Sequence, residues 1–188
     1  MKTSGLTEKR MSNKRFRETE QAIFIAYYTL KDYPTARRLA KRARISRATL
    51  YRHHSGVYAI PIDYEKYLLA TYKKTIGGLL RKNTGIKAVF LRTLVFISSN
   101  RMIFIVLFKD GRSDTVKKMI EFLKGRVVDE WRLGGDIDKI YSVYQYEVLG
   151  VIEVWSKQKF TTKQLDSILS DILYLTNTAR RNLLPLQQ

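Results

Sequence analysis

The chain has 188 residues, of which 45% are hydrophobic, so it is long and apolar enough for a small domain plus a larger one. It contains no cysteine, which excludes disulfides, thiolate catalysis and cysteine-ligated zinc. Its 35 Lys and Arg against 17 Asp and Glu give a formal charge of +18. Such an excess of positive charge favours a polyanionic partner, either nucleic acid or an anionic membrane surface.

The positive charge is densest near the N-terminus. Residues 1–55 hold 14 Lys and Arg against 4 Asp and Glu, a net of +10, whereas the remaining 133 residues carry a net of only +8. The N-terminus is polar and lacks the apolar segment of a secretory signal. The most apolar stretch, 86–108, is interrupted by Lys87, Arg92 and Arg101, which argues against membrane insertion. We therefore expect a cytoplasmic protein.

Apolar spacing and helix-breaking residues predict an all-α protein. Residues 1–15 are expected to form a basic, flexible arm. Thr35 and Ser46 precede two short helical segments as hydroxyl N-caps. Helices are predicted over Phe16–Leu30, Ala36–Ala43, Arg47–His53, from Pro61 to about Lys82, and over 86–99, 101–109, 114–132, 137–156 and 162–183.

The most informative segment is 35–54, TARRLAKRARISRATLYRHH. Its apolar residues, which include Leu39 and Leu50, have the spacing that locks two short helices together, and Ala40 is small where they must approach closely. Eight Lys and Arg lie between Lys31 and Arg52, against one acidic residue. The segment therefore predicts a helix-turn-helix whose second helix enters the major groove of DNA. A solvated basic hairpin that binds no DNA is the alternative.

This segment resembles the signature of the tetracycline-repressor-like (TetR) family, roughly T-x-x-x-I-A-x-x-A-G-V-S-x-G-T-L-Y-x-H-F. The matching residues, at the same spacing, are Thr35, Leu39, Ala40, Ala43, Ile45, Ser46, Thr49, Leu50, Tyr51 and His53. The chain departs from the signature at Arg44, which replaces a turn glycine that usually supplies a positive φ. It also departs at Ala48, which replaces a glycine, and at His54, which replaces an aromatic residue of the small core.

The resemblance implies a domain organisation of three parts. Residues 1–15 would form the arm, residues 16–60 a three-helix DNA-binding domain, and residues 61–188 a helical domain for effector binding and dimerisation. It also implies a sequence-specific transcription regulator, expected to be a homodimeric repressor released by a ligand. An activator, or a regulator controlled by a protein partner, remains an alternative.

The resemblance also implies residue roles on double-stranded DNA. Arg47, Thr49 and His53 would face the groove, with Arg52 beside them. Arg37 matches a position that some members use on a guanine, with which arginine pairs in a bidentate manner. Thr35 and Tyr51 would contact phosphates, which fix the register without reading sequence. The predicted DNA-binding residues are Thr35, Arg37, Arg47, Ala48, Thr49, Tyr51, Arg52 and His53.

The last two predicted helices have unusually wide apolar faces, which calls for a second covering surface. By resemblance, that surface would be the same two helices of a partner subunit in a homodimer; an ordinary buried pair of core helices is the alternative. A twofold dimer would demand a near-palindromic operator with half-sites about 34–36 Å apart. A small-molecule effector, also implied by the resemblance alone, would bind among residues 62–155, with Phe90, Phe104, Trp131 and Tyr144 as candidate walls.

Enzymatic function is not expected. The two histidines are adjacent, and no group of His, Asp and Glu has the spacing of a metal site. No metal or other cofactor is predicted. A non-specific polyanion binder, associated with the nucleoid or with anionic lipid, is the main alternative function.

Overall fold

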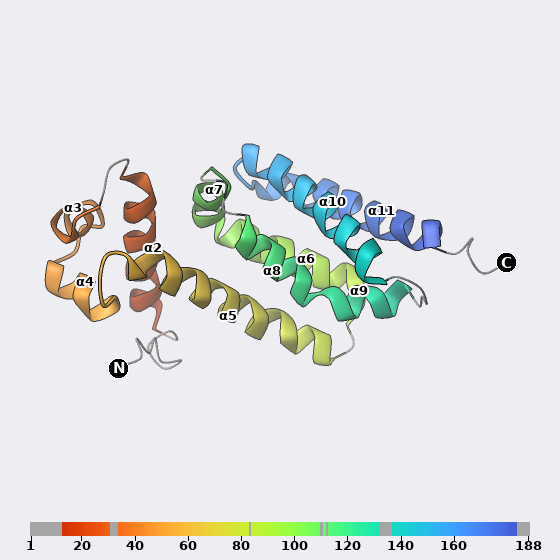
Figure 1. The fold of residues 1–188 in the computed structure, drawn as a ribbon, viewed down its shortest axis with the longest axis horizontal. Helices are drawn as coiled ribbons and strands as arrows, with labels where there is room; N and C mark the ends of the chain where they lie inside the picture. The colour runs from red at the N-terminus through yellow and green to blue at the C-terminus, as the bar shows by residue number, and fades with distance from the viewer. Residues whose placement is uncertain are drawn as a thin grey trace. The chain divides into compact units, whose positions relative to one another are not determined.

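The computed structural model is built from helices throughout the part of the chain that it describes (Figure 1). The described residues are 13–30, 34–82, 84–109, 111, 113–131 and 137–183. The helices are α2 (Lys14–Thr29), α3 (Ala36–Arg42), α4 (Arg47–His53), α5 (Ala59–Arg81), α6 (Ile86–Ser99), α7 (Arg101–Lys109), α8 (Asp114–Phe122), α9 (Lys124–Trp131), α10 (Ile137–Lys157), the 3₁₀ turn η1 (Thr162–Gln164) and α11 (Leu165–Leu183). The expected all-α class is confirmed for these residues.

The chain divides into two compact units, which we describe separately. Unit 1 comprises Met1–Ala70 and unit 2 comprises Thr71–Gln188. The boundary lies ten residues beyond the one expected from the sequence, because the first turns of α5 belong to unit 1. Ile60 is completely buried in the core of unit 1, and the ring of Tyr64 stacks on Phe24 with centroids 4.3 Å apart.

The core of unit 1 is small and draws on each of its helices. The buried residues are Ile23, Ala26, Leu39, Leu50 and Ile60. α2 contacts α3, and α3 contacts α4, so the two short helices are held against the longer one. Burial of these aliphatic side chains provides stability that helices of seven residues lack by themselves.

The N-terminal ends of the two short helices are set by the hydroxyl residues that the sequence predicts as N-caps. The Thr35 hydroxyl accepts a hydrogen bond from the Arg38 amide at 3.3 Å, and the Ser46 hydroxyl accepts one from the Thr49 amide at 3.0 Å. The turn between α3 and α4 contains Arg44 at φ 56°, the left-handed conformation that glycine adopts most easily. The strain expected from a non-glycine residue at this position is therefore present.

Unit 2 packs α10 against α11, with α6 on α11 and both α7 and α8 on α10. The single helix predicted over 114–132 is instead two helices, because the chain turns at Leu123, whose amide bonds to the Ile120 carbonyl at 2.9 Å. Among the described residues, no single helix has the length and hydropathy to cross a bilayer. Only α6 and α7 taken together reach that length and hydropathy among the described residues, and these two helices meet at an 82° bend.

Candidate nucleic-acid interface

Helix α4 has one buried side and one exposed side. Leu50 points into the core and is 2% exposed, whereas its neighbour Tyr51 is 56% exposed. Arg47, Ala48 and Arg52 are also exposed. The buried leucine fixes the rotation of the helix, and this rotation presents the two arginines and the tyrosine to solvent.

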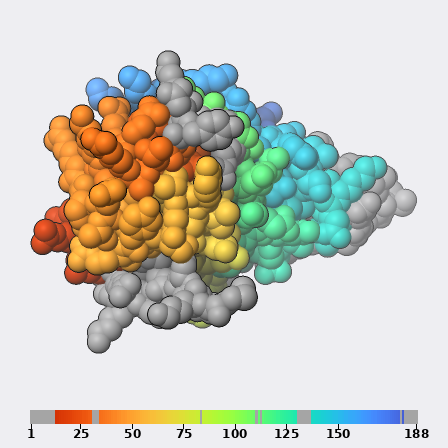
Figure 2. All heavy atoms as spheres, turned by 60° about the vertical axis from the view of Figure 1, so that its left-hand side comes forward, coloured from red at the N-terminus to blue at the C-terminus, as the bar shows by residue number. Residues whose placement is uncertain are grey.

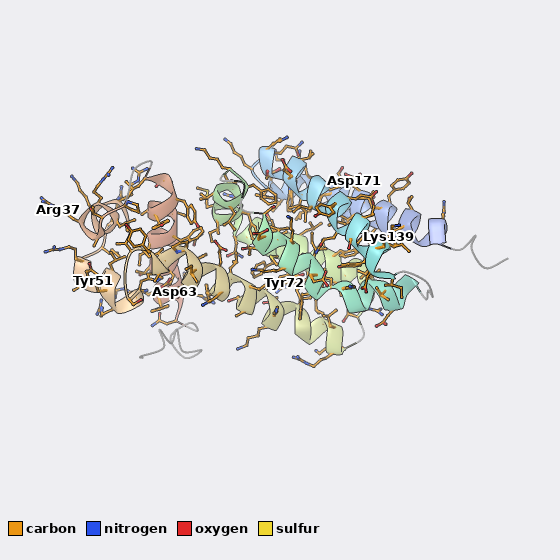
Figure 3. The ribbon with its side chains drawn as sticks, viewed as in Figure 1. Arg37, Tyr51, Asp63, Tyr72, Lys139 and Asp171 are labelled. Carbon is orange, nitrogen blue, oxygen red and sulfur yellow. The ribbon has the colours of Figure 1, made fainter. Side chains whose placement is uncertain are left out.

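A basic surface extends from α3 across the turn to α4. Figure 2 brings the orange surface of these two helices to the front, and Figure 3 labels Arg37 and Tyr51 on it. Residues 34–53 contain seven Lys and Arg and no Asp or Glu. The exposed cations are Arg37, Arg38, Lys41, Arg42, Arg44, Arg47 and Arg52. We call this set the basic face. Its positive charge is complementary to the phosphates of a nucleic-acid backbone.

Hydrogen bonds within α4 organise part of this face. The Thr49 hydroxyl lies 3.0 Å from the Ser46 hydroxyl and accepts a hydrogen bond of 3.0 Å from Arg52 Nη2. The Arg52 guanidinium is therefore held along the helix surface. The Thr35 hydroxyl likewise caps α3, so both predicted threonines have structural roles in addition to any contact with DNA.

His53 differs from the expectation, because its side chain turns inward rather than toward a groove. It is only 8% exposed, and its Nδ1 lies 2.5 Å from Glu20 Oε1. Its ring also stacks on Phe16, with centroids 4.2 Å apart. The reason is the buried carboxylate of α2, which gives the imidazole a stronger partner than water. We therefore leave His53 out of the candidate interface.

A buried cluster of ionisable groups lies beneath α4. His54 is 1% exposed and has a carboxylate on each side. Its Nε2 lies 3.1 Å from Glu20 Oε2, and its Nδ1 lies 3.2 Å from Asp63 Oδ2. The Nε2 contact has the distance of a hydrogen bond but not its alignment, so we regard it as an ion pair. We call Glu20, His53, His54 and Asp63 the histidine–carboxylate cluster; it joins α2, the end of α4 and the start of α5.

Electrostatics within the cluster oppose the effect of burial. Burial alone would raise the pKa of Glu20, but hydrogen bonding and charge from His53 and His54 lower that pKa below its usual value. Burial alone would lower the pKa of His54, but Glu20 and then Asp63 raise it. Both shifts favour the charged forms, as expected for a buried ion pair.

Sequence reasoning missed Glu20 and Asp63 as members of a site. A signal for Glu20 was present, because it lies four residues after Phe16 and three before Ile23, on the apolar stripe of the first helix. A carboxylate on a buried stripe needs a cationic partner. Two histidines where the TetR signature has a histidine and an aromatic residue supply that partner. Asp63 gave no comparable signal.

The residues proposed as walls of an effector pocket pack as core. Phe104 is fully buried and its ring contacts those of Phe96 and Phe160. Tyr144 is 1% exposed and its hydroxyl lies 3.0 Å from the Thr176 hydroxyl, and Phe90 is 4% exposed. The side chain of Trp131 falls outside the described residues. An effector therefore remains a prediction from the family resemblance.

The described part of the chain contains no group of three or more His, Cys, Asp or Glu side chains arranged to hold a metal ion. Comparisons with protein-family models, with curated proteins and with solved structures find no match to this chain. The resemblance of residues 35–54 to the TetR signature therefore depends on those residues alone.

Proposed function

We propose that the chain is a sequence-specific DNA-binding transcription regulator of the TetR type, in which α3 and α4 form a helix-turn-helix. α4 would be the recognition helix and would lie in the major groove. The observation that carries this proposal is the rotation of α4, which buries Leu50 and exposes Arg47, Tyr51 and Arg52 on a face without acidic residues.

The proposed roles follow from side-chain chemistry. Arg47 near the N-terminal end of α4 and Arg37 near that of α3 have the donors to read guanine, with about 1–3 kcal/mol of discrimination for each bidentate pair. Tyr51 and Thr35 would donate hydrogen bonds to phosphates and fix the register of the protein on the duplex. Arg52 would add electrostatic attraction, and Ala48 would allow the helix to approach the base edges closely.

We further propose that the regulator is a homodimer formed through α10 and α11. Val143, Gly150 and Val154 of α10 lie on one side of the helix by their spacing, and both valines are more than half exposed, at 57% and 54%. Tyr146 and Tyr174 are also exposed, at 66% and 69%. A β-carbon added to Gly150 would meet no neighbouring atom within 4 Å, so the surface there is open to a partner helix.

The test of DNA recognition is selection of preferred sequences from a random duplex pool. A specific regulator should favour its site over random DNA by about 10³–10⁷-fold, with two half-sites one helical turn apart. A non-specific polyanion binder would also weaken with salt, so salt dependence does not separate the two functions. Recovery of no preferred sequence would refute the proposal and favour the alternative.

Variants then test the assignment of residues. Arg47→Ala with Tyr51→Ala should abolish specific binding, while sedimentation still reports a folded dimer. Arg92→Ala removes an exposed arginine from unit 2 and is the matched control, which should retain affinity for the selected duplex. Val143→Glu with Val154→Glu should give a monomer, and a dimer of unchanged stability would contradict the proposed interface.

A further inference from the structure

We propose that His54 is a positioning residue for the recognition helix: as an imidazolium between two carboxylates, it fixes α4 against α2 and α5, and DNA affinity falls when it loses this proton at rising pH. The DNA part of this inference rests on the proposed function. The part that concerns the fold of unit 1 does not.

The argument begins with the two ring nitrogens of His54. A neutral imidazole has one N–H donor and one lone pair, whereas the imidazolium donates from both nitrogens. Here both nitrogens face carboxylate oxygens, Glu20 Oε2 at 3.1 Å and Asp63 Oδ2 at 3.2 Å. The Nε2 contact is not aligned as a hydrogen bond, so a neutral ring would place an uncharged nitrogen 3.1 Å from a buried carboxylate oxygen. A carboxylate oxygen beside each ring nitrogen therefore favours the doubly protonated, positively charged ring.

The surroundings of His54 make this proton important for stability. Glu20 is completely buried and His54 is 1% exposed, so water screens their interaction poorly. The titratable groups around the ring are Glu20 from α2, His53 from α4 and Asp63 from α5, and Tyr64 from α5 interacts with the same Glu20 carboxylate. Loss of the proton removes one of the two histidine partners of the buried Glu20 carboxylate, and weakening a buried ion pair in this way is destabilising.

His54 is well placed to transmit this effect to α4. It is the C-cap of that helix, and its backbone amide bonds to the Leu50 carbonyl at 2.9 Å. Its side chain also pairs with carboxylates of α2 and α5, the helices before and after α4 in the chain. A cation at this end also interacts favourably with the helix dipole. The pairs made by a charged His54 therefore add to the His53–Glu20 contact in fixing the end of the recognition helix against α2 and α5.

The sign of the pH effect follows from the direction of the pKa shift. The pKa of His54 is raised above its usual 6.5, so its stabilising contribution is complete below 6.5 and is lost as pH rises through the higher folded-state value. Between these two values, one proton released on unfolding changes the folding equilibrium by up to about tenfold per pH unit.

The first experiment measures the pKa of His54 in the intact protein by NMR. The chain has only two histidines, so the carbon-bound imidazole proton signals all come from this cluster. They can be assigned with the His53→Gln variant. We expect His54 to titrate above 6.5. Titration at or below 6.5 would overturn the proposal, and this measurement requires no DNA and no variant of His54.

The second experiment compares pH profiles of local stability by hydrogen exchange, corrected for the intrinsic exchange rate. Peptides from residues 13–70 should lose protection with rising pH, and peptides from unit 2 serve as the internal control. Asp63→Asn removes one carboxylate and should move the midpoint to lower pH. Asp171→Asn, an exposed substitution in unit 2, should leave it unchanged (Figure 3). An unmoved midpoint in Asp63→Asn would overturn the proposal.

The third measurement relates the protonation of His54 to DNA binding. Affinity for a duplex recovered by selection should fall with pH at the midpoint found for unit 1, and His54→Gln should flatten this profile even if it weakens binding overall. If His54 titrates as expected but no duplex is preferred at any pH, the proposed function fails and the structural role of His54 stands. Specific binding with the same pH profile in Asp63→Asn as in the unmodified chain would refute the positioning role alone.

Discussion

Replacing Arg44 by glycine should stabilise unit 1, because Arg44 occupies the left-handed region at φ 56°. This conformation costs a non-glycine residue about 1–2 kcal/mol. Glycine offsets about 0.4–1 kcal/mol of this gain, because its greater conformational freedom stabilises the unfolded chain. The Arg44 side chain is exposed, so little packing is lost. The expected net gain in the free energy of unfolding is about 0.5–1 kcal/mol.

The turn itself should persist in the variant. The Arg44 amide bonds to the Lys41 carbonyl at 3.2 Å, and the Ile45 amide bonds to the Ala40 carbonyl at 2.9 Å. Both bonds are made by the backbone and do not depend on the side chain at position 44. The substitution therefore tests backbone strain and not the loss of a contact.

Arg44→Ala is the matched control, because it loses the same charge and keeps the β-carbon. Urea unfolding should be followed by hydrogen exchange of peptides from unit 1, since both tryptophans, Trp131 and Trp155, lie in unit 2 and report on that unit. Glycine should be more stable than alanine by about 0.5–1 kcal/mol. A glycine variant no more stable than the alanine variant would refute the reasoning. Both should lose DNA affinity equally.

Three further predictions concern α4 and the cluster beneath it. Ser46→Ala removes the N-cap of α4 and should cost about 1 kcal/mol in urea unfolding, whereas Ser55→Ala, an exposed serine beyond the helix, should change little. Leu50→Ala should lower the free energy of unfolding by about 2–5 kcal/mol, because it leaves a cavity in the core. Tyr51→Ala should change it by no more than about 0.5 kcal/mol, because that side chain is mostly exposed. Equal losses in the two variants would contradict the rotation of α4. The lowered pKa of Glu20 contributes to the stability of unit 1, and this contribution is complete above pH 4.5 and is lost as pH falls through the folded-state value. Acid unfolding of unit 1 should therefore be less steep in Glu20→Gln. Superimposable acid transitions of the two proteins would show that Glu20 is not held ionised.

Local features of the sequence predicted much of the secondary structure. The predicted helix Arg47–His53 has the same bounds as α4. Ser46 caps its N-terminus, and the extended backbone of His54 ends it. The bounds of 86–99 and 101–109 agree with α6 and α7. These features are encoded within a few residues, where capping and apolar spacing act directly. The break at Leu123 was missed because this apolar residue continues the helical spacing of Val116, Met119 and Ile120, although Gly125 lies two residues beyond it.

What the sequence by itself determined is therefore the helical class, the short capped helices and the basic face around α4. Tertiary structure alone decided where the histidines point, because Glu20 is 33 and 34 residues away from His53 and His54 along the chain. It also decided how much of the wide apolar faces is covered within unit 2, where Tyr141, Tyr144 and Ile152 are buried and Val143 and Val154 are not. Periodicity identifies an apolar face, but only the packing of distant segments determines which neighbour covers it.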